Sequence, residues 1–117
     1  MPRDVRAYLS DIIDACEAIG TALGGVDLAT YQSERLIRSA VEREFITIGE
    51  AVISLRRADP SAAASLSHDR MIVGFRNVLV HDYASIDDET VLAIAANEVP
   101  ILKSECEAVM QRIGADD

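Results

Sequence analysis

The chain has no tryptophan, and two phenylalanines and three tyrosines are its only aromatic residues. Half of its 117 residues are nevertheless hydrophobic, and Ala, Ile, Leu and Val supply most of them. That composition favours packed helices over sheets, which draw more heavily on aromatic side chains. A chain of this length is enough for one domain and leaves little room for a second. We therefore expect an all-α fold in which residues 1–117 form one domain.

Cysteine is also scarce, because Cys16 and Cys106 are the only two and lack the CxxC spacing of metal and redox motifs. Each falls where an apolar helix face takes a small residue, so we expect buried free thiols rather than a disulfide or a metal pair. The sequence also lacks HExxH, P-loop and glycine-rich nucleotide motifs. No metal or other cofactor is therefore expected.

Basic residues are in the minority, with eleven against twenty acidic ones and a net charge of −9. Such a surface repels nucleic acid and anionic membranes, so any contact with RNA must be local. No apolar run approaches the roughly 18 residues of a membrane span. The first residues lack the apolar stretch of a signal peptide. We expect a soluble, cytoplasmic protein with no membrane partner.

Apolar residues recur at steps of three and four along most of the chain, which is typical of amphipathic helices. The expected helices span residues 3–22, 30–58, 69–81 and 87–113, with a short helical turn within residues 61–67. Ser67 or Asp69 is expected to cap the third helix. Pro100 lies inside the last helix and should kink it, because proline removes a hydrogen bond and crowds the preceding turn. The pattern predicts a four-helix up-down bundle with a kinked C-terminal helix.

The helix expected over residues 69–81 carries unusual polar residues. On a wheel of about 100° per residue, its apolar side chains cover more than half of the circumference. These are Ile72, Val73, Phe75, Val78, Leu79 and Val80. Gly74, Asn77 and His81 share a remaining sector of about 60°. Because a mid-helix glycine costs roughly 1 kcal/mol against alanine, we expect another helix to approach here, from a second copy of the chain or from the same bundle.

Arg76 lies about 140° from His81 on this wheel, and Tyr83 follows the expected end of the helix. The guanidinium of arginine is permanently charged and can donate two parallel hydrogen bonds to a phosphate, and histidine can shuttle protons at neutral pH. The pair therefore suits phosphodiester chemistry. A plainer interpretation is that Arg76 pairs with a carboxylate while Asn77 and His81 cap backbone groups. His68 has no partner motif and is assigned to the surface or to capping.

Arg76, His81 and Tyr83 form the pattern Arg-x4-His-x-Tyr, which resembles the HepT-like group of HEPN domains. Other matching segments extend over most of the chain in the same order. They are Val41-Glu42-Arg43 with Phe45, Ile48-Gly49-Glu50-Ala51, the run from Gly74 to His81, and Val99-Pro100-Ile101-Leu102-Lys103. The Arg-x4-His spacing alone is weak, but this ordered set is specific.

The resemblance implies a HEPN-like homodimer, able to assemble further, that acts as a metal-independent endoribonuclease on RNA. Arg76 and His81 of two protomers would line one cleft, with His81 transferring protons, Arg76 holding the scissile phosphate and Asn77 in support. Attack by the ribose 2′-OH would leave a cyclic phosphate end. DNA, which lacks that hydroxyl, would be left intact.

The resemblance also implies a type VII toxin–antitoxin pair, in which an MntA-like nucleotidyltransferase antitoxin transfers AMP onto Tyr83. The added phosphate would compete with RNA for Arg76 and His81. Asp82 stands where relatives often have glycine, and its carboxylate is expected to weaken RNA binding or to tune His81. The alternative function is a non-catalytic helical adaptor that helps a partner nucleotidyltransferase bind its substrate.

Overall fold

The computed structural model describes residues 4–116, and every regular element in that range is helical. The α-helices are α1 (Val5–Leu23), α2 (Leu28–Ser33), α3 (Arg35–Ala58), α4 (Pro60–Ala64), α5 (Asp69–His81), α6 (Asp88–Asn97) and α7 (Val99–Asp116), and η1 (Tyr83–Ser85) is a 3-10 turn. The all-α prediction is confirmed, and so are the bounds expected for α5. The short helical turn expected within residues 61–67 is present as α4, which begins at Pro60 and ends at Ala64. Arg3, where the first helix was expected to begin, lies outside the described residues.

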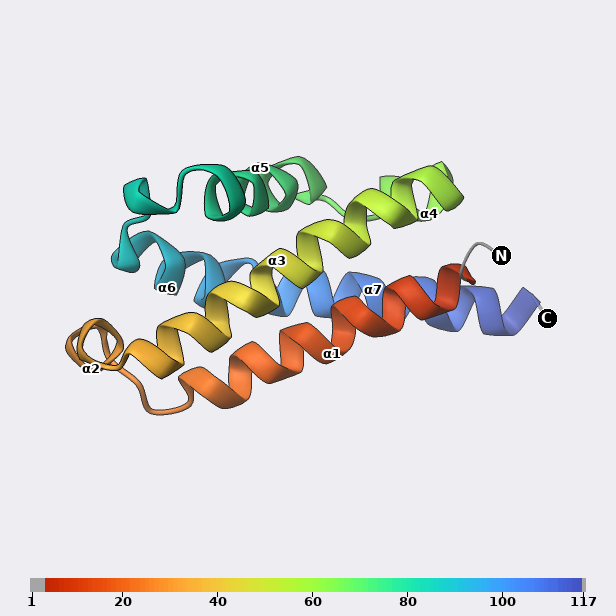
Figure 1. The fold of residues 1–117 in the computed structure, drawn as a ribbon. Helices are drawn as coiled ribbons and strands as arrows, with labels where there is room; N and C mark the ends of the chain where they lie inside the picture. The colour runs from red at the N-terminus through yellow and green to blue at the C-terminus, as the bar shows by residue number, and fades with distance from the viewer. Residues whose placement is uncertain (1–3, 117) are drawn as a thin grey trace.

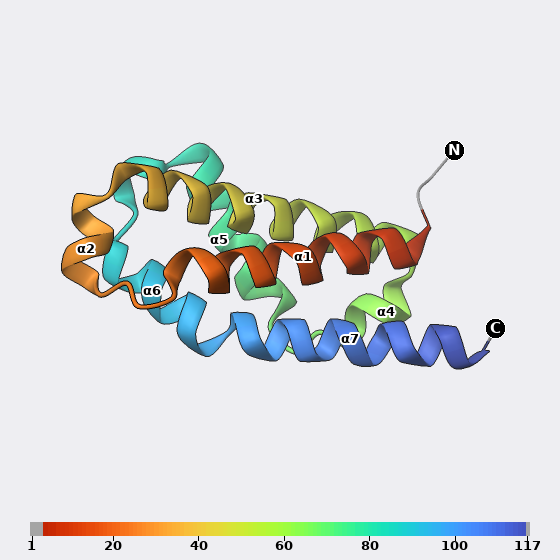
Figure 2. The same ribbon diagram turned by 90° about the horizontal axis from the view of Figure 1, so that it is seen from below.

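Helix α3 runs through the middle of the molecule, with α1 packed on one side and α5 on the other (Figure 1). Helix α7 packs along α1, and α6 leads into α7. The start of α1 and the end of α7 lie at the same end of the molecule, and α2 lies at the opposite end (Figure 2). The predicted four-helix bundle is therefore present as α1, α3, α5 and the bent pair α6–α7, with α2 and α4 as short additions.

The core is built from the apolar stripes of these helices. Its largest fully buried side chains include Leu9, Ile12, Ile19, Phe45, Ile48 and Leu55. Phe45 of α3 meets Phe75 of α5 edge to face, with ring centroids 5.0 Å apart and an interplanar angle of 80°. Such a contact contributes about 0.5–1.5 kcal/mol beyond the apolar area that it buries. No helix within residues 4–116 combines the length and the apolar character that crossing a membrane requires.

Both cysteines are buried and unpaired, as predicted from their positions on apolar helix faces. Burial raises the pKa of the Cys16 thiol to about 12, because the thiolate is poorly solvated there. The same cause raises the pKa of Cys106 to about 12. Both groups are therefore thiols at neutral pH and pack as small apolar residues.

The C-terminal helix is bent, as predicted from Pro100. Regular helix stops at Asn97 and resumes at Val99, with Glu98 between α6 and α7. Pro100 has no N–H to donate, and its ring crowds the carbonyl one turn earlier, so the chain bends just before it. Pro100 itself lies in the first turn of α7, where a missing N–H costs little.

The prediction of one unbroken helix over residues 30–58 was wrong, because the chain turns at Glu34 between α2 and α3. Glu34 has φ −107° and ψ 90°, an extended conformation that ends α2. Arg38 compensates by donating from Nη1 to the carbonyl of Tyr31 at 3.2 Å and to that of Gln32. The turn lets the short α2 insert Tyr31 fully into the core.

The N-cap expected for α5 was also wrong, since His68 occupies that position and makes no capping hydrogen bond with its side chain. Ser67 is engaged elsewhere, because its hydroxyl donates to Glu105 Oε2 of α7 at 2.5 Å. Asp69 is engaged by Arg56 of α3, with Nη2 and Oδ2 2.8 Å apart. His68 lies at the surface, as predicted, with Nδ1 against Glu98 Oε2. These contacts attach the start of α5 to its neighbours.

Candidate functional site on helix α5

Helix α5 carries the predicted catalytic pair, and only one side of it is packed. Ile72 and Leu79 are buried, and α3 is the helix against which α5 packs most extensively. Val78 and Val80 are 38% and 43% exposed. Apolar residues over more than half of the circumference predict burial on several sides, and that prediction was wrong for one copy of the chain. Their period fits a buried face, but within the described chain no other helix covers the side of α5 that faces away from α3.

Gly49 of α3 is the point where α5 comes closest. A Cβ added at Gly49 would lie 2.3 Å from Cβ and 2.5 Å from Cγ of Arg76. Atoms so near the Arg76 backbone cannot move aside without moving α5 itself. The aliphatic stem of Arg76 therefore lies across a notch in α3 that only glycine can provide.

The guanidinium of Arg76 is held from two sides at the end of this notch. Its Nη1 donates to Asn77 Oδ1 at 2.9 Å. Its Nη2 lies 3.6 Å from Oε1 of Glu50, the residue after Gly49. The Arg76 Nε is buried and has no hydrogen-bond partner. Arg76 therefore pairs with a carboxylate, as the plainer interpretation of the sequence predicted. This pairing leaves the outer N–H groups of Nη1 and Nη2 for a ligand.

Gly74, Asn77 and His81 all lie on the exposed side of α5. Apart from the neighbours of Gly74 and the backbone of α5 itself, no atom of residues 4–116 lies within 4 Å of a Cβ added at Gly74, so no other described helix approaches there. The within-bundle alternative for Gly74 is thereby excluded. Val78 is exposed on the neighbouring edge of the same face. We call Gly74, Asn77, Val78 and His81 the open face of α5.

Arg76 and His81 do not meet within one copy of the chain. Among residues 4–116, the polar contacts of Arg76 go to Glu50 of α3 and to Asn77 of the open face, and none goes to His81. His81 lies on the open face, in the last turn of α5. Asn77 therefore connects the two regions, because it belongs to the open face and also holds Arg76.

Tyr83 follows α5 in a short and well-anchored segment. Asp82 ends the helix with φ −149° and ψ 48°, and η1 begins at the next residue. Ser85 holds the turn, donating from its backbone N–H at 3.0 Å and from its hydroxyl at 2.8 Å to the Asp82 carbonyl. Tyr83 is 72% exposed. The side chain is therefore accessible to a modifying enzyme, close in sequence to His81.

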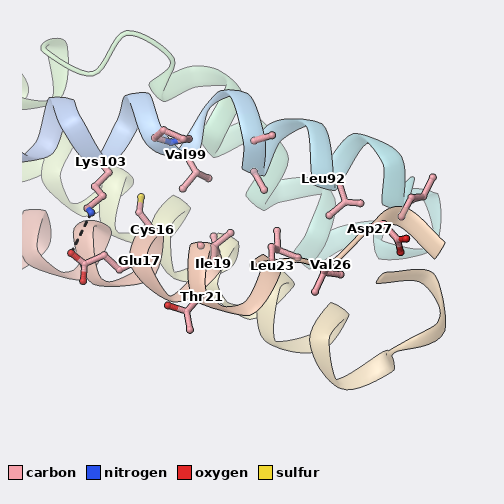
Figure 3. A pocket seen from close by; sticks show the side chains of 16 residues that line it. Cys16, Glu17, Ile19, Thr21, Leu23, Val26, Asp27, Leu92, Val99 and Lys103 are labelled. Atoms are coloured by element: carbon pink, nitrogen blue, oxygen red, sulfur yellow. Dashed lines mark ion pairs between the residues drawn. The ribbon is translucent and has the colours of Figure 1, made fainter. Parts of the chain in front are cut away.

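A cavity of about 900 Å³ lies elsewhere, in a groove between α1 and the α6–α7 pair (Figure 3). Its lining is mainly apolar and includes Ile19, Leu92 and Val99. Lys103 Nζ lies 3.5 Å from Glu17 Oε1 at one end. None of the predicted site residues lines this groove. Among the described residues, no group of three or more His, Cys, Asp or Glu side chains is arranged to hold a metal ion.

Sequence reasoning missed the roles of Gly49 and Glu50. Both were noted only as part of a segment shared with a family. A signal was available, because Gly49 interrupts the apolar stripe of a long helix where glycine is costly. That signal marks a close approach but does not name the partner. Only the fold brings Gly49 and Glu50 to Arg76.

The chain is similar in sequence to known proteins of one family. Residues 12–109 match the family described as Ribonuclease HepT-like. A Methanocaldococcus jannaschii protein named "Putative RNase MJ1380" is 32% identical over 107 residues, which cover 92% of this chain and 97% of that protein. A second from the same organism, "Putative RNase MJ1216", is 28% identical over 115 residues, covering 98% and 94% of the two chains. No solved structure matches the chain at a significant level.

The match covers most of the helical bundle and assigns the chain to a class of ribonucleases. The chain belongs to the HepT-like ribonuclease family. The family expected from the sequence is confirmed, and with it the enzyme class.

The notch predicts that Gly49→Ala destabilises the fold. The new methyl group must push α5 away from α3, and overpacking of this kind typically costs about 1–3 kcal/mol. This outweighs the gain of roughly 1 kcal/mol that alanine brings to a helix interior. The matched control is Gly20→Ala in α1, where a Cβ would meet nothing within 4 Å. Urea unfolding should show a lower stability for Gly49→Ala and an equal or higher one for Gly20→Ala. Equal stability of both variants would contradict the notch.

Proposed function

We propose that this chain is a metal-independent endoribonuclease, the toxin of a toxin–antitoxin pair, whose site is shared by two protomers. The observation that carries the proposal is the open face of α5. Gly74 leaves room there for another helix, and His81 and Asn77 lie beside it without any covering element of the same chain. Membership of the HepT-like ribonuclease family supports RNA as the substrate.

Two protomers related by a two-fold axis would bring two open faces together. His81 of each copy would then lie near the junction, and Arg76 would reach it from the flank through Asn77. This arrangement supplies what one copy lacks, since Arg76 and His81 are on different sides of the helix. The exposed Val78 would be covered in the same contact, which accounts for an apolar residue at this position.

The proposed reaction is an attack of the ribose 2′-oxygen on the adjacent phosphorus. An imidazole of His81 accepts the 2′-OH proton, and the imidazolium so formed returns a proton to the departing 5′-oxygen, so the P–O5′ bond breaks as the P–O2′ bond forms. The products are a 2′,3′-cyclic phosphate and a 5′-hydroxyl end. The Arg76 guanidinium stabilises the negative charge that builds on the phosphoryl oxygens. DNA has no 2′-OH and is not cleaved.

Silencing would proceed through Tyr83, which is exposed beside the site. A cognate nucleotidyltransferase would direct the Tyr83 hydroxyl oxygen to the α-phosphorus of ATP, with release of pyrophosphate and of the phenolic proton. The AMP phosphate left on Tyr83 would compete with RNA for Arg76, and the bulk of the AMP group would obstruct the cleft between the two protomers. The strongly negative surface fits this regulation, because RNA binding already depends on a local patch.

The first prediction of this proposal concerns His81. Purified protein should cleave RNA in the presence of a metal chelator. His81→Ala should fold normally, and its cleavage rate should be lower by about 100-fold or more, since a positioned proton-transfer group contributes 10²–10⁴-fold. His68→Ala is the matched control, because His68 is the other histidine and lies at the opposite end of α5. Cleavage by His81→Ala at the wild-type rate would remove the enzyme mechanism proposed here.

A second prediction concerns the shared site. Val78→Glu places a charge on the open face, so it should convert dimers to monomers and abolish most of the cleavage. Ile101→Glu in α7 is matched in exposure, at 43% against 38% for Val78, and should change neither property. Light scattering after gel filtration gives the mass, and circular dichroism checks the fold. A monomeric Val78→Glu protein with full activity would show that one protomer suffices.

A third prediction concerns the modification. With the neighbouring nucleotidyltransferase and ATP labelled at the α-phosphate, label should enter the wild type and Tyr8→Phe but not Tyr83→Phe. The labelled protein should lose RNA cleavage, and hydrolysis of the phosphodiester should restore it. Equal labelling of Tyr83→Phe and the wild type would show that another residue accepts AMP.

A further inference from the structure

Glu50 is the one group at the end of the notch to which the proposed reaction assigns no task. It follows Gly49 in α3, and its carboxylate is the only acid that contacts Arg76 among the described residues. We propose that Glu50 is a positioning residue that sets the plane of the Arg76 guanidinium for the phosphate. This inference rests on the proposed ribonuclease function and deepens its account of the site.

The first step in the argument is that the stem of Arg76 is already fixed. A Cβ at Gly49 would overlap Cβ and Cγ of Arg76 and would lie 3.4 Å from its Cδ. These three carbons therefore pass across the backbone of α3 in close contact. What remains free is rotation near the end of the side chain, and this rotation decides where the two Nη groups point.

The second step is that one hydrogen bond and one ion pair limit this remaining freedom. Asn77 Oδ1 receives Nη1 at 2.9 Å, and Glu50 Oε1 lies 3.6 Å from Nη2. The two acceptors come from different helices, so together they define the plane of the guanidinium. Gly49 and Glu50 are neighbours in the chain, so the notch and the anchor move as one piece of α3.

The third step is that this contact leaves Arg76 usable. Arg76 is 21% exposed, and its Nε is buried without a partner, so a phosphate can reach only the outer N–H groups of Nη1 and Nη2. A carboxylate that masked the arginine would form a bidentate pair with the fork. Glu50 instead makes a single contact with Nη2 and is 58% exposed. The geometry thus fits an anchor at the edge of the guanidinium.

The position of Glu50 favours the reaction, whereas its negative charge opposes the binding of RNA. An exposed ion pair of this kind contributes little to stability, and a carboxylate beside a phosphate site repels RNA. Orientation of Arg76 matters in the chemical step, whereas repulsion of RNA matters in binding. Glu50 should therefore increase kcat while also increasing KM, and its removal should lower both.

The experiment measures steady-state cleavage of one short RNA by the full-length wild type, Glu50→Ala and Glu50→Gln. Glu44→Ala is the matched control, since it removes the same charge from α3 at a position with no contact to Arg76. Glu50→Ala should lower kcat about tenfold, because small misplacements of a reacting group cost up to about 100-fold, and should lower KM as well. Glu50→Gln keeps an acceptor for Nη2 and should recover most of kcat while keeping the low KM.

Three outcomes of the kinetics would overturn the proposal. One is an unchanged kcat in Glu50→Ala or a loss no larger than that in Glu44→Ala. Another is a rise in kcat in both Glu50 variants, which would mean that the carboxylate masks Arg76. A loss of kcat that glutamine does not recover would also contradict an anchoring role, because the acceptor is retained.

A second readout separates this proposal from the ribonuclease function itself. NMR of the ¹⁵N-labelled Arg76 side chain reports rotation about the Cζ–Nε bond without any RNA. Slow rotation in the wild type and Glu50→Gln, with faster rotation in Glu50→Ala, is expected. If the wild type proves inactive on RNA while this pattern holds, the proposed function fails and the anchor stands. If rotation is the same in all three proteins, the anchor fails whatever the activity.

Discussion

The close approach of α3 and α5 at Gly49 is the constraint on which the rest of the site depends. Because Gly49 has no side chain, the stem of Arg76 can cross the backbone of α3, and its guanidinium then reaches both Glu50 and Asn77. The Phe45–Phe75 contact stabilises the same pair of helices. Packing and function are therefore inseparable here: a residue that widened the gap would release the arginine as well as weaken the core.

This constraint also explains why α5 has two unlike sides. The side toward α3 is closed and orients Arg76, whereas the opposite side carries Gly74, Asn77, Val78 and His81 in the open. A single copy of the chain thus carries Arg76 on the packed side of α5 and His81 on the open side, connected by Asn77. In the proposed dimer, two open faces meet and bring a guanidinium and an imidazole to one phosphate.

Much of the fold could be predicted from the sequence, because local patterns determine it. Apolar residues at steps of three and four predicted α1 and α5, and Pro100 predicted the bend before α7. The turn at Glu34 could not be predicted, since it depends on Tyr31 entering the core and on Arg38 capping α2. For the site, the spacing identified Arg76, His81 and Tyr83 as candidates. That spacing could not predict the residues that Arg76 contacts. Gly49 and Glu50 precede Arg76 by more than two dozen residues, and only tertiary packing connects them. Val78 and Val80 misled for a related reason, because an apolar period does not say whether the covering surface belongs to the same chain.

The central claim is that each cleavage site takes residues from two protomers. Mixing Arg76→Ala protein with His81→Ala protein, each inactive alone, tests it most directly. After exchange of subunits, mixed dimers contain one intact Arg76 and one intact His81 at the cleft between the two protomers. The account predicts that part of the RNA cleavage returns in proportion to the mixed dimers formed. Mixed dimers that form but stay inactive would contradict it.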